Sequence, residues 1–240
     1  DADLLAAAAD LSRELAKDAI VRLLAAGVLM PEPTGPDGGY TFKHVLQREA
    51  AYGCLISQRR RMIHQRIVDF IEDGDCDTPD WEPEFFAFHY QSAGDADKAS
   101  KLWVKAAQAA IARFAHEEVL SHTDKGALLL PEVAAESAKR LEVDLYASRG
   151  AALRALEGFG APSSMEVTRM AFDRALDIGD LRVLLHTGRA LSVAHHVRAE
   201  YEDAVFYARS IEAEIGDDRF GHMIVRSLLA MPMIWQGRFH

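Results

Sequence analysis

The stretch that decides the fold is residues 40–71, YTFKHVLQREAAYGCLISQRRRMIHQRIVDFI. It begins with a short alternating run, Tyr40, Phe42 and His44, which is typical of a β-strand. Apolar residues then recur close to the 3.6-residue period of a helix, and neither proline nor a glycine-rich segment interrupts them. A second helical run at residues 62–71 carries charged residues between its apolar positions. The stretch therefore predicts a strand that leads directly into two helices.

The residues upstream of this stretch predict the front of a small helical domain. Helical patterns in residues 2–26 precede a predicted hairpin at 28–44, whose tip at 31–39 is rich in proline and glycine. Helices followed by a hairpin and further helices are typical of a winged-helix-like domain, which we place at residues 1–73. The polar, proline-containing segment that follows predicts a domain boundary.

Residues 80–240 show helical patterns with an internal repeat. The segment ALDIGD at 175–180 recurs as EAEIGD at 212–217, which is a spacing of 37 residues. A small or polar turn precedes an aromatic residue at both Tyr201 and Phe239, which are 38 residues apart. Two helices in each period of about 34–40 residues predict a tetratricopeptide-like α-solenoid. The expected fold is therefore mainly α, with one short β-hairpin.

The composition favours a soluble protein of a reducing compartment. The chain has 240 residues, of which 49% are apolar and 27% charged, and no run of residues is apolar enough to span a membrane. Two cysteines do not form a disulfide framework, so we expect a cytoplasmic location. The chain begins at Asp1 and ends in a turn-like sequence, so we expect a fragment of a longer protein.

The sequence predicts neither catalytic residues nor a bound cofactor. It contains no phosphate-binding loop, no H-E-x-x-H zinc motif and no G-x-S-x-G nucleophile motif. The adjacent His195 and His196 point to different sides of a helix, and His116 and His122 lack a metal-binding spacing. We therefore expect a chain that is not an enzyme and holds no metal.

Residues 42–64 resemble a known family. The pattern F-x-H-x-L-x-x-E-A-A-Y, followed by an arginine-rich helix with a histidine, is similar to the end of the winged-helix region in STAND-type signalling proteins. The positions that carry the likeness are Phe42, His44, Leu46, Glu49, Ala50, Ala51, Tyr52, and Arg59 to His64. The closest likeness is to bacterial proteins that join a class III adenylate/guanylate cyclase domain, an AAA-type ATPase and a tetratricopeptide tail.

The resemblance implies a regulatory and interaction module whose partners include the ATPase and cyclase domains of its own parent protein. The candidate residues for docking onto those domains are His44, Glu49, Arg59, Arg60, Arg61 and His64. The alternatives are that His44 is a packed polar residue and that the arginines form a solvated helix face. Related regulators carry DNA-binding domains instead, so a transcriptional regulator whose winged helix contacts DNA is the second interpretation.

The charge distribution disfavours nucleic acid as a partner. The formal net charge is −10, and only residues 43–66 form a basic segment. The predicted wing tip at 34–39 contains Asp37 and neither lysine nor arginine. We therefore expect only weak DNA binding that does not depend on sequence.

The repeat predicts a second set of candidate residues in the solenoid. The first helices of two successive pairs are expected at 181–197 and 218–236, and first helices line the concave groove of such arrays. Basic side chains fall on matching faces of these helices, and they suggest a groove for an acidic protein or peptide. They are Arg182, His186, Arg189, His196, Arg219 and Arg226. The alternative is that they face solvent or pair with neighbouring carboxylates.

The last predicted helix has apolar residues on a face without a following neighbour. We expect residues 218–236 to expose Met223, Met233 or Trp235. We expect this helix either to fray or to bury its apolar face against a second chain. A homo-oligomer is therefore an open alternative.

Overall fold

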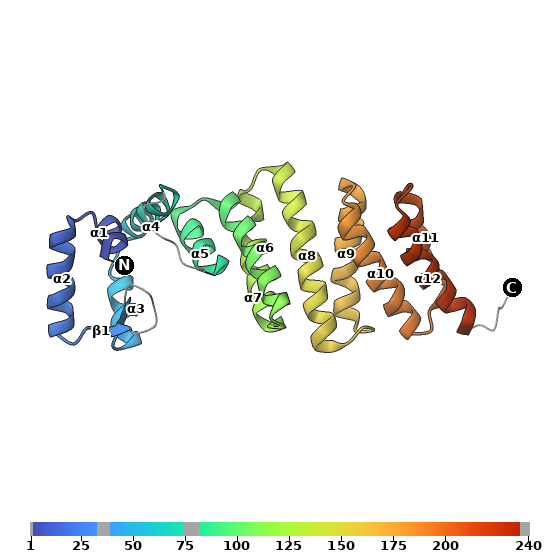
Figure 1. Ribbon diagram of the computed structural model, residues 1–240, viewed down its shortest axis with the longest axis horizontal. Coiled ribbons are helices and arrows are strands. Elements are labelled where there is room, and N and C mark those ends of the chain that lie inside the picture. The colour runs from blue at the N-terminus through green and yellow to red at the C-terminus, as the bar shows by residue number, and fades with distance from the viewer. Residues whose placement is uncertain (1, 33–38, 74–81, 236–240) are drawn as a thin grey trace. The chain divides into compact units, whose positions relative to one another are not determined.

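The computed structural model describes residues 2–32, 39–73 and 82–235 (Figure 1). These residues are mainly helical, with twelve α-helices, one short 3-10 helix and an early two-stranded antiparallel hairpin. The elements are α1 (Ala2–Ala9), α2 (Arg13–Ala25), β1 (Leu29–Glu32), β2 (Gly39–Phe42), α3 (Val45–Gly53), α4 (Ser57–Glu72), α5 (Pro83–Ala93), α6 (Ala96–Ala112), α7 (His116–Leu129), α8 (Ala135–Glu157), α9 (Pro162–Ile178), α10 (Leu181–Val197), α11 (Tyr201–Glu214) and α12 (Arg219–Trp235). Consecutive helices pack against one another, as in a helical array.

The chain divides into two compact units, residues 1–99 and 100–240, and the division lies inside α6. The predicted boundary after residue 73 falls on residues 74–81, which lie outside the described part of the chain. In the first unit, α1 packs against α2 and α4, and α4 packs against α5. This unit therefore includes α5, a helix that the sequence pattern assigns to the repeat region.

The hairpin of the first unit pairs β1 with β2 in an antiparallel register. Leu29 faces Phe42 and Pro31 faces Tyr40, so the first strand extends through a proline that the sequence pattern assigns to the loop. A two-stranded ribbon has only edge strands, and an edge strand tolerates a residue that lacks a backbone N–H. The predicted wing tip at 34–39 lies almost entirely outside the described residues.

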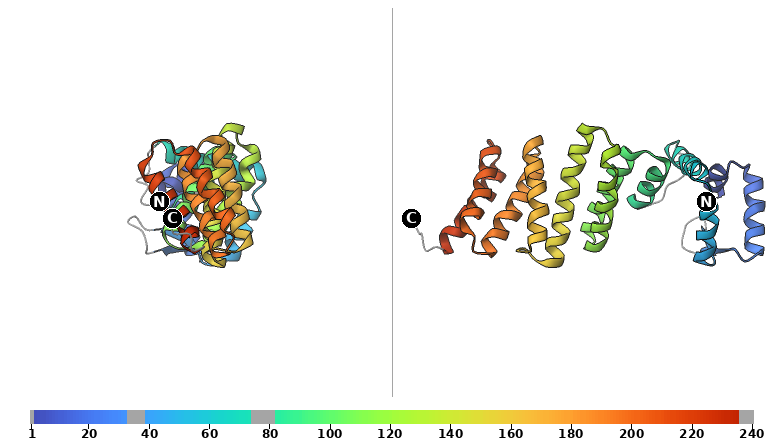
Figure 2. Two further views of the ribbon diagram at one scale, coloured as in Figure 1. Left: turned by 90° about the vertical axis from the view of Figure 1, so that its right-hand side faces the viewer. Right: turned by 180° about the vertical axis from the view of Figure 1, so that it is seen from behind.

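The helices of the second unit form two rows. Figure 1 and the right-hand view of Figure 2 show the helices α8 to α12 one after another. Each helix contacts the next one in the chain. In addition, α10 contacts both α8 and α12, so these three helices form one row and α9 and α11 lie in the other. The main core lies between the rows and includes Phe172, Leu191, Tyr207 and Ile211.

Local sequence sets the ends of these helices. Asp180 accepts a hydrogen bond from the backbone N–H of Val183 at 3.0 Å and caps α10, while Gly179 ends α9 in the left-handed conformation at φ +71°. Pro162 occupies the first turn of α9, where its missing N–H has no helical partner. The predicted bounds of 181–197 and 218–236 are confirmed to within one residue.

Candidate functional site

A groove lies between α10 and α12 in the second unit. It has a volume of about 770 Å³ and is lined by Leu181, Arg182, Leu185, His186, Arg189, Phe220 and Ile224. The first five residues come from one face of α10, and the last two come from α12. The groove therefore combines a basic stripe with apolar walls contributed by both helices.

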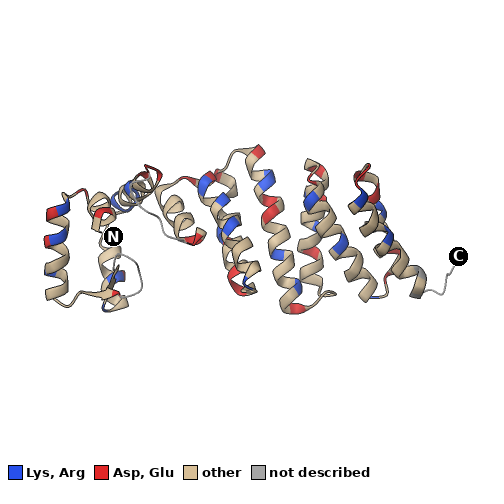
Figure 3. Ribbon diagram, in the orientation of Figure 1, with Lys and Arg blue, Asp and Glu red and all other residues tan. Residues whose placement is uncertain are grey.

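The basic stripe follows from helical spacing and from the contact between α8 and α10. Arg182, His186 and Arg189 are four and three residues apart, which places them on one side of α10. Arg154 of α8 joins them, because its charge acts on both His186 and Arg189. Figure 3 shows basic residues on both helices. Desolvation in the groove, followed by the charges of Arg154, Arg189 and Arg182, lowers the pKa of His186, although the residue remains exposed to solvent.

The carboxylates near the stripe leave two of its arginines uncompensated. Arg182 donates a hydrogen bond to Asp144 of α8 at 2.8 Å, and this pair is partly exposed. Within the described ranges, neither Arg154 nor Arg189 forms a salt bridge. Arg154 instead lies over the ring of Phe159, with 5.6 Å between the guanidinium carbon and the ring centroid. The cluster of Arg154, His186 and Arg189 therefore has unused hydrogen-bond donors and positive charge.

The structure brings together only part of the basic set that the sequence predicts for this groove. Arg182, His186 and Arg189 line it, whereas Arg219 and Arg226 are exposed on α12 outside its lining. His196 lies near the end of α10, where its ring is 5.5 Å from that of Tyr201. In this groove, α12 therefore contributes apolar side chains, and a role of its exposed arginines in partner binding stays a prediction.

Sequence reasoning did not find Arg154, Phe220 or Ile224. Arg154 precedes Arg189 by 35 residues, which lies within the repeat period, so an alignment extended back to α8 could have found it. The apolar pair on α12 has the four-residue spacing of one helix face, but this spacing is equally typical of a buried core. Only the placement of α12 beside α10 shows that these two residues border a groove.

Two of the docking candidates in the first unit stabilise the contact between α4 and α5. Arg61 donates a hydrogen bond from Nε to the carbonyl of Ala93 at 2.8 Å, so it caps the end of α5. His64 is buried, with its Nδ1 atom 2.9 Å from Nδ1 of His89 and its Nε2 atom 3.0 Å from the hydroxyl of Tyr52. Both residues therefore have structural roles within this unit.

The other docking candidates are more accessible. His44 and Glu49 are exposed at and within α3, a helix that has no buried residue. Arg59 borders a hollow of about 390 Å³ beside Arg66. Arg60 lies over the ring of Tyr52 at 5.3 Å from its centroid. His44, Glu49 and Arg59 are exposed, whereas Arg60 is half-buried, and the docking role of all four stays a prediction.

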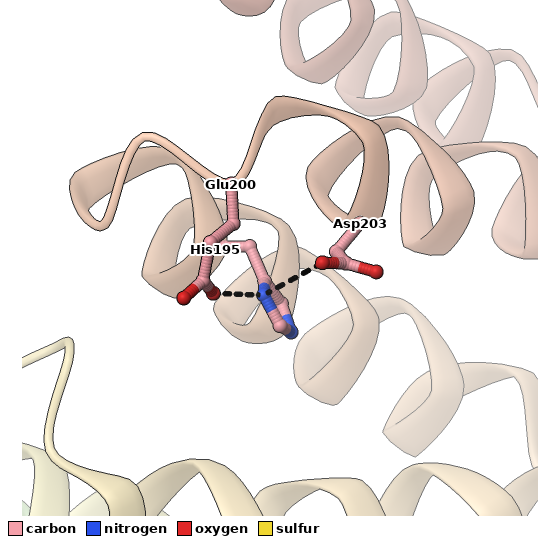
Figure 4. A group of neighbouring side chains, drawn as sticks. All are labelled: His195, Glu200 and Asp203. Atoms are coloured by element: carbon pink, nitrogen blue, oxygen red, sulfur yellow. Dashed lines mark hydrogen bonds and ion pairs between the residues drawn. The ribbon is translucent and has the colours of Figure 1, made fainter.

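A cluster of side chains between α10 and α11 contains three residues that could each offer a metal ligand. Figure 4 shows His195, Glu200 and Asp203, whose ligand atoms lie within 4.8 Å of one another. Glu200 is already bonded on both oxygens, to Nδ1 of His195 and to Nε of Arg198, each at 2.8 Å. These bonds hold the pKa of the Glu200 carboxyl below its usual range. The hydrogen bonds of Glu200 therefore stabilise the turn between α10 and α11.

Comparisons with known protein families and with curated proteins found no match for this chain. Among the described helices, none is long and apolar enough to cross a lipid bilayer.

Proposed function

We propose that the chain is a non-catalytic interaction module whose α10–α12 groove binds an acidic segment with apolar side chains. The observation that carries this proposal is that Arg189, which forms no salt bridge with the described residues, lines one groove together with Phe220 and Ile224, while Arg154 adds its positive charge from α8. Arginine presents several N–H donors in a planar arrangement that matches a carboxylate. Apolar side chains of the same partner would cover the exposed Phe220 and the partly buried Ile224.

We further propose that the helices of residues 80–240 form a tetratricopeptide-like solenoid that follows a winged-helix-like domain. Two rows of helices, with α8, α10 and α12 in one row, support a tetratricopeptide-like solenoid. The starts of α10 and α12 are 38 residues apart, which fits the predicted period. Helices and a short hairpin in residues 2–53 support a winged-helix-like unit.

The parent protein is inferred from the motif in residues 42–64. Its resemblance favours a multidomain signalling ATPase, with the present chain regulating an adenylate/guanylate cyclase output. The exposed His44, Glu49 and Arg59 then provide contacts to the ATPase domain. A transcriptional regulator with the same ATPase and repeat organisation is the alternative parent.

A charge reversal at Arg189 tests the groove. The probe is a short fluorescent peptide made of equal numbers of leucine and glutamate, compared with a peptide in which glutamine replaces glutamate. We expect Arg189→Glu to weaken binding of the acidic peptide about tenfold or more, because it replaces a donor by a repelling charge. Fluorescence anisotropy at physiological salt measures the affinity.

Arg226→Glu is the matched control. Arg226 is also an exposed arginine in the same row of helices, but it lies outside the groove lining. This variant should bind the peptide as the unchanged chain does, and both variants should keep their melting temperature. Equal affinities in the two variants, or equal binding of the glutamine peptide, would refute the groove proposal.

A further inference from the structure

His186 occupies a position that is distinct from those of the other groove residues. It lies between Arg182 and Arg189 on the groove face of α10, and Arg154 approaches from α8. An imidazole at this place can take up a proton, whereas the three guanidinium groups are already charged. The same groove thus contains fixed positive charge and one group whose charge depends on conditions.

The charged groups around His186 come from two helices. On α8 they are Arg154 and Asp144, and the carboxylate of Asp144 is engaged by Arg182. On α10 they are Arg182 and Arg189. The residues that α12 contributes to the lining, Phe220 and Ile224, are apolar. Helices α9 and α11 pack on the buried side of α10, around Gly188, and contribute no lining residue.

We propose that His186 takes up a proton when an anionic segment enters the groove, so that binding and protonation are coupled. This inference rests on the proposed function, since it requires an anion at the arginine cluster. Without the anion, desolvation and then the positive charges of Arg154, Arg189 and Arg182 oppose a charge on the imidazole. A bound carboxylate offsets those neighbours and accepts a hydrogen bond from the imidazolium.

The direction of the pH effect on affinity follows from the pKa of His186 with and without the bound anion. The pKa of His186 is lowered in the empty groove and is expected to be higher in the occupied one. Affinity should therefore rise as the pH falls through the pKa of the occupied groove, and it should level off below the pKa of the empty groove. The steepest change that one proton permits is about tenfold per pH unit.

Calorimetry of the complete chain with the leucine–glutamate peptide tests the coupling. Titrations in two buffers that differ in ionisation enthalpy report the number of protons taken up. We expect net uptake, and an affinity at least about threefold higher at about pH 5.5 than at about pH 7.5. His186→Gln should abolish both effects, because glutamine does not titrate.

His222→Gln is the control, since His222 lies on α12 outside the groove lining and should leave proton uptake as it is. Uptake that persists in His186→Gln would overturn the inference, as would binding of the peptide without uptake in the unchanged chain. Either result would leave the proposed groove intact. Failure of the peptide to bind at both pH values would instead refute the proposed function, and with it the coupling.

Discussion

At the residue scale, the contact between the buried His64 and the half-buried His89 of the first unit limits the charge that the two rings can carry. Only one proton fits between the two Nδ1 atoms of His64 and His89, which are 2.9 Å apart. The rings of Phe85 and Phe88 contact those of His89 and His64, respectively. Burial and the charge of His64 lower the pKa of His89 to about 4.

This pair predicts that acid weakens the first unit. The unfolded chain binds a proton at a histidine near pH 6.5, whereas folded His89 resists protonation until about pH 4. The contribution of neutral His89 to the free energy of unfolding is therefore complete above about pH 6.5, and it is lost as the pH falls towards 4. We expect a loss of about 2 kcal/mol in the free energy of unfolding at about pH 5, measured by urea denaturation followed by circular dichroism.

Two variants, one at the paired histidine and one at an exposed histidine, separate this effect from a general sensitivity of the protein to acid. His89→Gln removes the titrating group and should flatten the pH dependence between these limits. His44→Gln removes an exposed histidine of the same unit and should leave the dependence as it is. A pH dependence that is identical in all three proteins would argue against the buried pair as its source.

At the element scale, close approach of helices depends on small residues at particular positions. A Cβ atom at Gly188 of α10 would lie 2.8 Å from side-chain atoms of both Ile211 and Phe172. Alanines have the same role elsewhere, since Ala107 and Ala110 of α6 are fully buried beside Val119 of α7. These contacts explain why the apolar stripes of the helices contain so many small side chains.

Gly188→Val should therefore destabilise the second unit. The added side chain requires Ile211 or Phe172 to move, and overpacking of this kind costs about 1–3 kcal/mol. Thermal unfolding measures the effect as a lower melting temperature. Gly53→Val is the control, because no atom lies within 4 Å of a Cβ at Gly53. An equal response at both glycines would show that backbone preference, rather than packing, dominates.

At the scale of the whole molecule, the helices of the array differ in how many neighbours they have. Helix α10 packs against α8, α9, α11 and α12, whereas the main contacts of α12 among the described elements are with α10 and α11. Phe220, Met223 and Ile234 are exposed on α12. The expected exposure of Met223 is confirmed, and the side chains of Met233 and Trp235 lie outside the description.

We therefore predict that the backbone amides of α12 exchange with solvent faster than those of α10 in dilute protein. Local opening costs less free energy where fewer apolar contacts hold a helix. Hydrogen-exchange mass spectrometry compares the two helices within one sample. If two chains associate through α12, its protection should rise with protein concentration while that of α10 stays constant. Equal protection of both helices at low concentration would contradict the prediction.

The sequence by itself determined the mainly helical fold, the short hairpin and the bounds of α10 and α12. Such features depend on local signals, namely apolar periodicity, the Asp180 cap and the left-handed glycine at Gly179, which act over a few residues. The sequence also identified His186 and Arg189 as candidate binding residues, because helical spacing alone places them on one face of the helix.

Only the tertiary structure decided what those faces meet. The arginine-rich run looks uniform in sequence, yet Arg61 caps α5 and His64 is buried against His89, while Arg59 stays accessible. Likewise, the charge of Arg154 acts on His186 and Arg189 because α8 contacts α10, and the groove residues contributed by α12 are apolar. The physical reason is that periodicity specifies which side chains share a face, whereas the packing of helices distant in sequence determines which faces are covered.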